Sequence, residues 1–238
     1  MKRILTLIFV FSAITLYSQE VPRQKVVIEV GTDIGCPSCP AVVHIIDYFI
    51  AVGANISVIG YHNNDTLQNP ASVIRINYYG IPWTPTTYYD GRHIEYDDWA
   101  TSSVHVAYYN QSISERTSFS LSAKGEVGSD SVSGTVTINK VANFSGTNLK
   151  LHIVLTESKI QEIWEGETEV NFVERAMFPD GNGTTIDFTN GSSQEIAFSI
   201  PMNSEWIPEN CELVFFLQDN DTKKIAQGNS VMLNDLKL

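Results

Sequence analysis

The sequence predicts a two-domain α+β protein, in which an α/β domain is followed by an all-β domain. Two observations support this prediction. Up to about residue 110, strand-like runs alternate with helical patterns of apolar residues. From about residue 116, short alternating runs separated by Gly, Asn, Asp and Ser are typical of an immunoglobulin-like β-sandwich. We therefore place the two domains at residues 25–111 and 116–238.

The first half has elements in the order strand, helix, strand, helix, hairpin and helix. Their predicted positions are residues 25–31, 37–51, 55–62, 69–80, 84–96 and 97–111. Pro70 suits the first turn of the second helix and Gly80 suits its end. Asp90-Gly91 is a strong signal for a hairpin turn. In the second half, the mixed segment 160–188 is predicted to form either a helix or a long hairpin.

Residues 1–18 have the pattern of a secretory signal peptide. Lys2 and Arg3 precede an apolar run of fourteen residues, shorter than the roughly 20 that span a bilayer. No later stretch is long and apolar enough to cross a membrane. We therefore expect an exported protein, located in the periplasm or at the outer membrane, or secreted.

Net charge limits the classes of partner. The chain has a formal net charge of −12 at pH 7, and loss of Lys2 and Arg3 with the signal peptide changes it to −14. Because a charge of this sign repels phosphate backbones, nucleic acid is a poor partner. Export also places the three cysteines where disulfides persist.

Cys36 and Cys39 form a CxxC pair at the start of the first predicted helix. The pair can be a zinc half-site, a structural disulfide or a redox pair. The sequence has no second CxxC and no histidines at ligand spacing, so no metal site is expected. At a helix N-terminus, free N–H groups and the helix dipole stabilise the thiolate of Cys36. Cys36 is then the predicted nucleophile, and Cys39 resolves the mixed disulfide.

A second segment, "YYGIPWTPTTYYDG", places two prolines just before a predicted strand. Pro85 is expected at the first position of that strand, because proline cannot donate to a sheet ladder. Together with the CxxC, this segment resembles the thioredoxin-like pattern. The resemblance implies that Pro85 is cis and that Thr84 pairs with an extended protein client; an ordinary trans proline is the alternative. Trp83 is predicted to form a hydrophobic lip for the client or to pack against the last helix.

Most of the chain also resembles the twenty-eight-kilodalton outer-membrane protein family of Bacteroidetes-type bacteria. The residues that carry this resemblance are "VVIEVGTDIGCPSCP", "YHNNDTLQNPASVIRINYYGI" and "FVERAMFPDGNG". It implies an exported thioredoxin-like domain followed by a C-terminal β-sandwich.

Two positions depart from the thioredoxin pattern. Gly35 stands where efficient thioredoxins have a tryptophan, and Val30 stands where they have a buried acid that relays protons. Glu29 is adjacent to Val30, but one step along a strand turns a side chain to the other face of the sheet. A fast, general reductase is therefore not what these residues favour.

Other polar residues have a weaker signal. Asp65 and Arg75 are candidates to pair across the loop and helix that follow the second strand. The predicted role of this pair is to order the loop, and contact with a substrate is the alternative. Cys211 is predicted to be a small buried side chain, with intermolecular pairing as the alternative.

Two functions follow from these residues. The preferred hypothesis is an exported thiol–disulfide oxidoreductase that acts on protein clients with thiols or disulfides. It needs a redox partner protein and no cofactor, with Cys36 and Cys39 as catalytic residues and Trp83, Thr84 and Pro85 as client contacts. The alternative is a non-catalytic envelope or outer-membrane binding protein on a thioredoxin scaffold, with Cys36–Cys39 as a structural disulfide. The missing tryptophan and acid favour the alternative.

Overall fold

The computed structural model describes residues 19–95 and 98–238. The predicted signal peptide, residues 1–18, lies outside the described residues. The described part of the chain is mostly β, with three α-helices that all lie in the first half: α1 (Cys39–Ala51), α2 (Pro70–Tyr79) and α3 (Ser102–Ser114).

The ends of α2 follow directly from local sequence. The Asn69 side chain accepts hydrogen bonds from the N–H groups of Ala71 and Ser72, and the Ser72 hydroxyl accepts from the Asn69 N–H. The helix ends at Gly80, whose φ of 67° is left-handed. The helix predicted from Pro70 and Gly80 is therefore confirmed.

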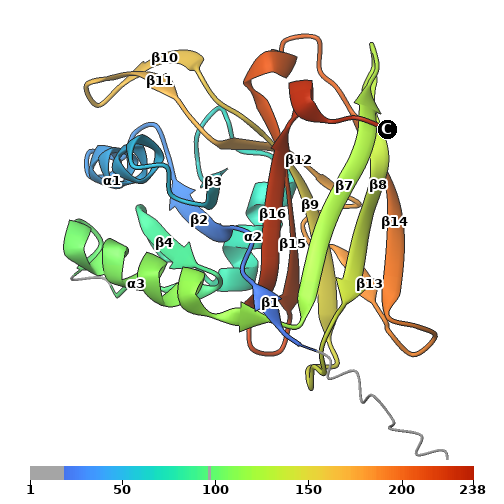
Figure 1. Ribbon diagram of the computed structural model, residues 1–238. Coiled ribbons are helices and arrows are strands. Elements are labelled where there is room, and N and C mark those ends of the chain that lie inside the picture. Colours follow the sequence, from blue (N-terminus) through green and yellow to red (C-terminus); the bar gives the residue numbers. More distant parts are fainter. Residues whose placement is uncertain (1–18, 96–97) are drawn as a thin grey trace, which may run out of the picture.

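One nine-stranded sheet runs through both halves of the chain (Figure 1). Neighbouring strands β2 (Val26–Thr32) and β3 (Ile56–His62) are parallel, as expected for a strand–helix–strand unit. In spatial order the sheet contains β16 (Ile225–Met232), β15 (Cys211–Asp219), β9 (Leu149–Glu157), β12 (Val173–Phe178), β3 (Ile56–His62), β2 (Val26–Thr32), β4 (Thr86–Tyr89) and β5 (Arg92–His93), with β13 (Thr184–Ile186) paired to β9.

Strand β12 joins the two halves and overturns the predicted fold class. It is antiparallel to β9 and parallel to β3, where Val173 pairs with Gly60. The Gly60 N–H also donates to the Phe172 carbonyl at 2.7 Å. A thioredoxin-like α/β domain followed by a separate immunoglobulin-like sandwich is therefore wrong, because strands from both halves share one sheet. The alternation of apolar and polar residues along a strand predicts which side chains lie on each face of the sheet. It does not predict which other strand pairs with it.

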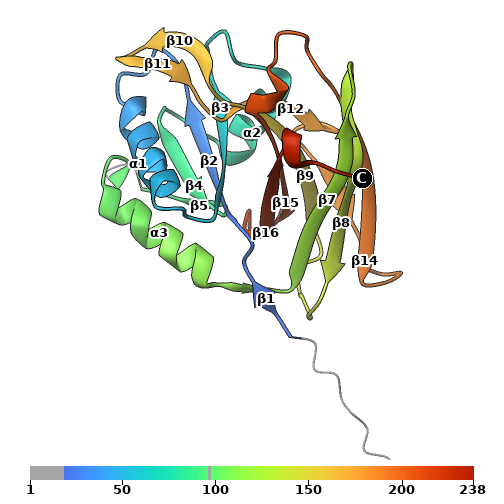
Figure 2. The ribbon, with the colours of Figure 1, turned by 45° about the horizontal axis from the view of Figure 1, so that its top comes forward.

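Layers cover the sheet on both faces (Figure 2). Helices α1 and α3 pack on one face of the β2–β4 region, and α2 packs on the other. The strands β9 and β15 pack against a second, three-stranded sheet, which contains β14 (Ser193–Pro201), β8 (Ser131–Lys140) and β7 (Phe119–Val127).

The remaining elements are short. Segment 160–188 forms a hairpin rather than a helix at its start, with β10 (Ile160–Trp164) paired to β11 (Glu167–Val170). The other short elements are β1 (Val21–Pro22), which pairs with β6 (Arg116–Thr117), and the 3₁₀ helices η2 (Pro208–Asn210) and η3 (Leu233–Asp235).

A buried ion pair lies where α2 meets the large sheet. Arg75 Nη2 on α2 is 2.6 Å from Glu29 Oε1 on β2, and each side chain is 1% exposed. The hydroxyls of Tyr61 and Tyr79 donate to the Glu29 carboxylate, and Arg75 donates to Gln218 Oε1 on β15 at 3.0 Å. Because these residues come from both halves of the chain, the network ties them together.

Glu174 on β12 makes the stability of this junction depend on pH. Burial raises the pKa of its carboxyl to about 7, and the Asn69 side chain and the Arg175 charge lower it only in part. Burial likewise raises the pKa of Asp90 to about 6. Since these two pKa values lie above their usual values, each of the two groups holds its proton in the folded protein at a pH where it has lost it in the unfolded chain. The contribution of these two groups to stability is therefore largest at low pH and is lost as the pH rises toward 7.

We expect Glu174→Gln to remove most of the loss of stability between pH 6 and pH 7. The wild-type loss there is at most about 1.4 kcal/mol for each pH unit per group. Urea unfolding at several pH values measures it. The matched control is Glu195→Gln, which changes an exposed glutamate on β14 and should keep the wild-type slope. A Glu174→Gln variant with the wild-type slope would contradict the assignment.

Candidate functional site

The cysteines Cys36 and Cys39 form a disulfide at the N-terminus of α1, with their Cα atoms 5.4 Å apart. The turn that carries them is held by local hydrogen bonds. The Cys39 N–H donates to the Cys36 carbonyl at 3.1 Å, and the Gly35 N–H donates to Asp33 Oδ1 at 2.9 Å. The residues at the start of α1 are thus fixed by their own backbone and by Asp33.

The disulfide is enclosed by the protein. Cys36 is 5% exposed and Cys39 is 2% exposed. Both belong to a hydrophobic cluster with Trp164 and Val170 of the β10–β11 hairpin and Val173 of β12. The sequence gives no sign of this cover, because the hairpin lies more than 120 residues further along the chain.

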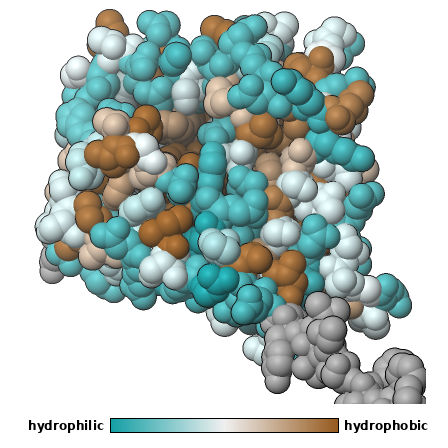
Figure 3. Space-filling view, viewed as in Figure 1, coloured by the Kyte–Doolittle hydropathy of each residue, from teal (hydrophilic) through white to brown (hydrophobic). Residues whose placement is uncertain are grey.

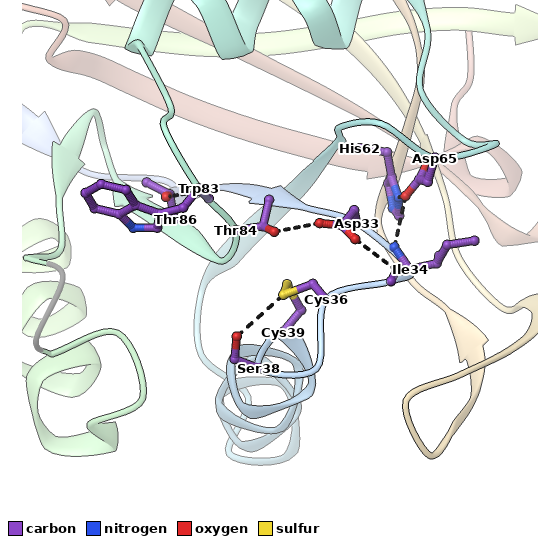
Figure 4. Close-up of a disulfide and its surroundings, with 11 residues drawn as sticks. Asp33, Ile34, Cys36, Ser38, Cys39, His62, Asp65, Trp83, Thr84 and Thr86 are labelled. Atoms are coloured by element: carbon purple, nitrogen blue, oxygen red, sulfur yellow. Dashed lines mark hydrogen bonds and ion pairs between the residues drawn. A yellow bond between two sulfur atoms is a disulfide. The ribbon is translucent and has the colours of Figure 1, made fainter.

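The Trp83–Thr86 loop lies beside the disulfide (Figure 4). The Thr84–Pro85 peptide bond is cis, as the resemblance implied. The Thr84 hydroxyl donates to Asp33 Oδ2 at 2.6 Å, and the Thr86 hydroxyl donates to the Trp83 carbonyl at 2.6 Å. Asp33 therefore links this loop to the turn that carries the cysteines.

A hollow of about 350 Å³ opens at this place. Its walls are Ser38, Trp83, Thr84, Pro85 and Trp99, and the Ser38 hydroxyl lies 3.6 Å from Cys36 Sγ. Trp83 is 44% exposed. The three predicted contact residues are thus close together, while their role in binding a client stays a prediction. Trp99 was not predicted, and its only signal in the sequence is an aromatic residue at the start of the closing helical pattern.

Glu29 lies on the face of β2 away from the disulfide, as the alternation of the strand predicted. Its carboxylate is bound to Arg75 and to two tyrosine hydroxyls. Val30 lies on the α1 side of the sheet, in the cluster that contains Val42 and Ile46. The side chain that faces α1 at this point of β2 is therefore apolar.

The proposed pairing of Asp65 with Arg75 is not formed. His62 Nδ1 at the end of β3 lies 2.6 Å from Asp65 Oδ2 instead. Asp65 also accepts hydrogen bonds from the N–H groups of Ile34 and Leu67. Although burial raises the pKa of Asp65, the contact with His62 and these two N–H groups lower it below its usual value. Asp65 orders the loop that leads to Cys36, which matches the first of the two roles considered for it.

Cys211 is a buried free thiol, as predicted for a small core side chain. Burial, with a smaller effect from nearby Glu157, raises the pKa of this thiol to about 12. Its Sγ donates to the Ile207 carbonyl at 3.3 Å. A thiol in these surroundings is held in its protonated, unreactive form.

The fold is similar to those of two solved structures. The HBP35 protein of Porphyromonas gingivalis has a TM-score of 0.77 at 15% identity, covering 92% of this chain and 78% of that one. Protein AGR_C_4864 of Agrobacterium tumefaciens has a TM-score of 0.59 at 15% identity, covering 91% and 97%. These likenesses show the fold alone. No curated protein matches the chain.

The family comparison is more specific. The sequence model of the family described as outer membrane protein Omp28 matches residues 75–237 of this chain, which are 163 of its 238 residues. Within the described part of the chain, none of the helices has the length and apolarity needed to cross a membrane. Export to the periplasm or outer membrane, predicted from the sequence, is confirmed by the family. The chain therefore belongs to the Omp28 family of outer membrane proteins.

Proposed function

We propose that this protein is a non-catalytic binding protein of the bacterial envelope, in which Cys36–Cys39 is a permanent structural disulfide. The observation that carries this proposal is the enclosure of the disulfide. Both cysteines are at most 5% exposed and pack against Trp164, Val170 and Val173. Thiol–disulfide exchange requires a thiolate to reach a sulfur atom, so this packing opposes it.

The surroundings of Cys39 also oppose turnover. Cys39 would have to lose its proton to resolve a mixed disulfide, and apolar surroundings raise the pKa of a thiol. Val30 provides no proton acceptor, and the Glu29 carboxylate is bound within the Arg75 network. The disulfide is thus suited to hold a turn in place rather than to exchange.

The hollow beside the disulfide is the proposed binding site. Two tryptophans, Trp83 and Trp99, form part of its walls, and aromatic side chains often dominate the binding energy of protein interfaces. The Thr84–Asp33 hydrogen bond fixes one wall to the turn that the disulfide closes. Because this wall is held in place, little entropy is lost when a ligand binds. The ligand we propose is an extended segment of another envelope protein.

The redox equilibrium of Cys36–Cys39 in glutathione buffers tests this proposal. We expect a reduction potential below about −300 mV, the range of structural disulfides. Alkylation followed by mass measurement gives the reduced fraction. Since Cys211 is a third cysteine, a Cys211→Ser variant serves as the reporter background.

Cross-linking in cells tests binding and turnover together. A photo-reactive residue at position 83 should capture an envelope protein in a complex that survives dithiothreitol. The same residue at position 195, on the exposed side of β14, is the control and should not capture it. In a Cys39→Ser variant, no complex that dithiothreitol releases should accumulate.

One observation favours the oxidoreductase as a second candidate. Cys36 Sγ lies at the N-terminus of α1 with the Ser38 hydroxyl 3.6 Å away, next to the hollow. In that case Cys36 is the nucleophile, Cys39 resolves, and a redox partner resets the pair. A potential between about −120 and −270 mV, together with mixed disulfides in Cys39→Ser, would favour this function over the binding protein.

A further inference from the structure

The β10–β11 hairpin lies next to α1 (Figures 1 and 2), and its side chains pack against the disulfide. It is a two-stranded sheet of its own. Trp164 and Val170 pack inward in the cluster that contains Cys39. At the outer edge, His44 Nε2 on α1 lies 2.9 Å from Glu167 Oε1 on the hairpin. The hairpin is thus attached to the rest of the protein mainly by one apolar cluster and by its two ends.

Both ends of the hairpin have an uncommon backbone conformation. Lys159, just before β10, has a φ of 59°, and Phe172, just after β11, has a φ of 61°. Residues other than glycine rarely adopt this left-handed backbone conformation. Residues that do so cluster at switch segments and ligand clamps. The ends are held by hydrogen bonds from Lys159 N–H to Asn171 and from Phe172 N–H to Ser158. Small rotations at these two residues would move the hairpin as a unit.

A mainly apolar cavity of about 40 Å³ lies beneath the hairpin. This volume holds a few water molecules at most. It shares no wall residue with the hollow at Trp83. Its walls come from α1, β2, β3 and the hairpin, and include Val30, Val42, Ile46, Val58, Trp164 and Val170.

The cavity wall contains four polar residues, Thr32, His62, Glu169 and Asn171, of which His62 has a buried side-chain atom with no hydrogen-bond partner among the described residues. The buried imidazole directs Nδ1 to the Asp65 carboxylate, which only accepts hydrogen bonds when ionised. In the neutral ring, Nδ1 therefore carries the proton and Nε2 is an acceptor. His62 Nε2 is buried and has no hydrogen-bond partner among the described residues. Since buried polar atoms are usually paired, this acceptor is available to a hydrogen-bond donor that enters the cavity.

We propose that the cavity beneath the β10–β11 hairpin is a lid-gated site for a small aromatic alcohol. The ligand hydroxyl donates to His62 Nε2, and the ring packs among the valine, isoleucine and tryptophan side chains. A benzene ring needs a cavity of about 150 Å³, so the hairpin must move outward to admit it. This site is independent of the proposed binding function at Trp83.

Titration of the full-length exported protein with phenol tests this proposal. The indole N–H resonance of Trp164, assigned with a Trp164→Phe variant, reports occupancy beneath the lid. Phenol should bind saturably with a Kd below about 1 mM, a modest value for seven heavy atoms. Toluene has the same shape without the hydroxyl and should bind at least about tenfold more weakly.

The variants localise the effect. His62→Phe should abolish the preference for phenol over toluene, whereas His44→Gln, at the exposed edge of α1, should keep it. Phenol should also slow hydrogen exchange at the hairpin amides. Equal binding of phenol and toluene to the wild-type protein overturns the proposal without any variant. So does a phenol titration that leaves the Trp164 resonance unchanged.

Discussion

Replacement of Arg75 by methionine is expected to lower the free energy of unfolding by about 3–5 kcal/mol. The side chains of Arg75 and Glu29 are each 1% exposed, and Arg75 Nη2 lies 2.6 Å from Glu29 Oε1. Loss of the guanidinium leaves the Glu29 carboxylate buried with only the Tyr61 and Tyr79 hydroxyls as partners. Methionine keeps much of the volume of the side chain, so the effect reports the missing charge. Urea unfolding of the oxidised protein at pH 7 measures it.

Two further variants separate the charge effect from general damage. Arg116→Met removes an exposed arginine on β6 and should change stability by no more than about 0.5 kcal/mol. Glu29→Gln combined with Arg75→Met should cost less than the sum of the single variants, because no unpaired charge is then left. A loss below about 1 kcal/mol for Arg75→Met alone would show that water reaches the carboxylate.

Gly91→Ala is expected to destabilise the protein by at least about 3 kcal/mol. Gly91 has a φ of 79° in the turn between β4 and β5. A Cβ atom at this position would lie 1.9 Å from the carbonyl oxygen of Lys223, in the turn between β15 and β16. Since the Cβ atom would clash with a backbone atom, one of the two turns must move. The Ile225 N–H, which donates to the Asp90 carbonyl at 3.0 Å, would lose its partner as well.

Gly53→Ala is the matched control for this prediction. Gly53 has a similar φ of 70°, but a Cβ atom there would have no neighbour within 4 Å. It should therefore cost only the backbone penalty of about 1–2 kcal/mol. The difference between the two variants measures how tightly the two turns are docked. Equal losses in both would mean that the turns separate easily.

On the face of the molecule seen in Figure 3, no extended apolar patch marks a site for a partner. In the view of Figure 3, hydrophobic residues form small separate groups among hydrophilic ones. Exposed apolar residues that are scattered in this way are normal for soluble surfaces. The two proposed sites, the hollow at Trp83 and the cavity beneath the hairpin, are therefore argued from their own geometry and not from an extended apolar face.

Features that depend on neighbours along the chain were predictable from the sequence. Pro70, Asn69 and Gly80 set the ends of α2, and Asp90-Gly91 set the turn between β4 and β5. The alternation of β2 placed Glu29 and Val30 on opposite faces. The resemblance to the outer-membrane protein family was also correct. Of the three runs that carried it, "FVERAMFPDGNG" lies within the matched residues 75–237, and "VVIEVGTDIGCPSCP" lies before them.

The other features depend on contacts between segments that are distant in the sequence. Arg75 pairs with Glu29, 46 residues away, rather than with Asp65, and β12 pairs with β3 as its parallel neighbour. The β10–β11 hairpin then came to lie over the disulfide at the start of α1. The physical reason is the same in each case. A charged or apolar residue in the sequence indicates that its side chain needs a partner in the folded protein. Which residue becomes that partner depends on how distant segments pack and exclude water.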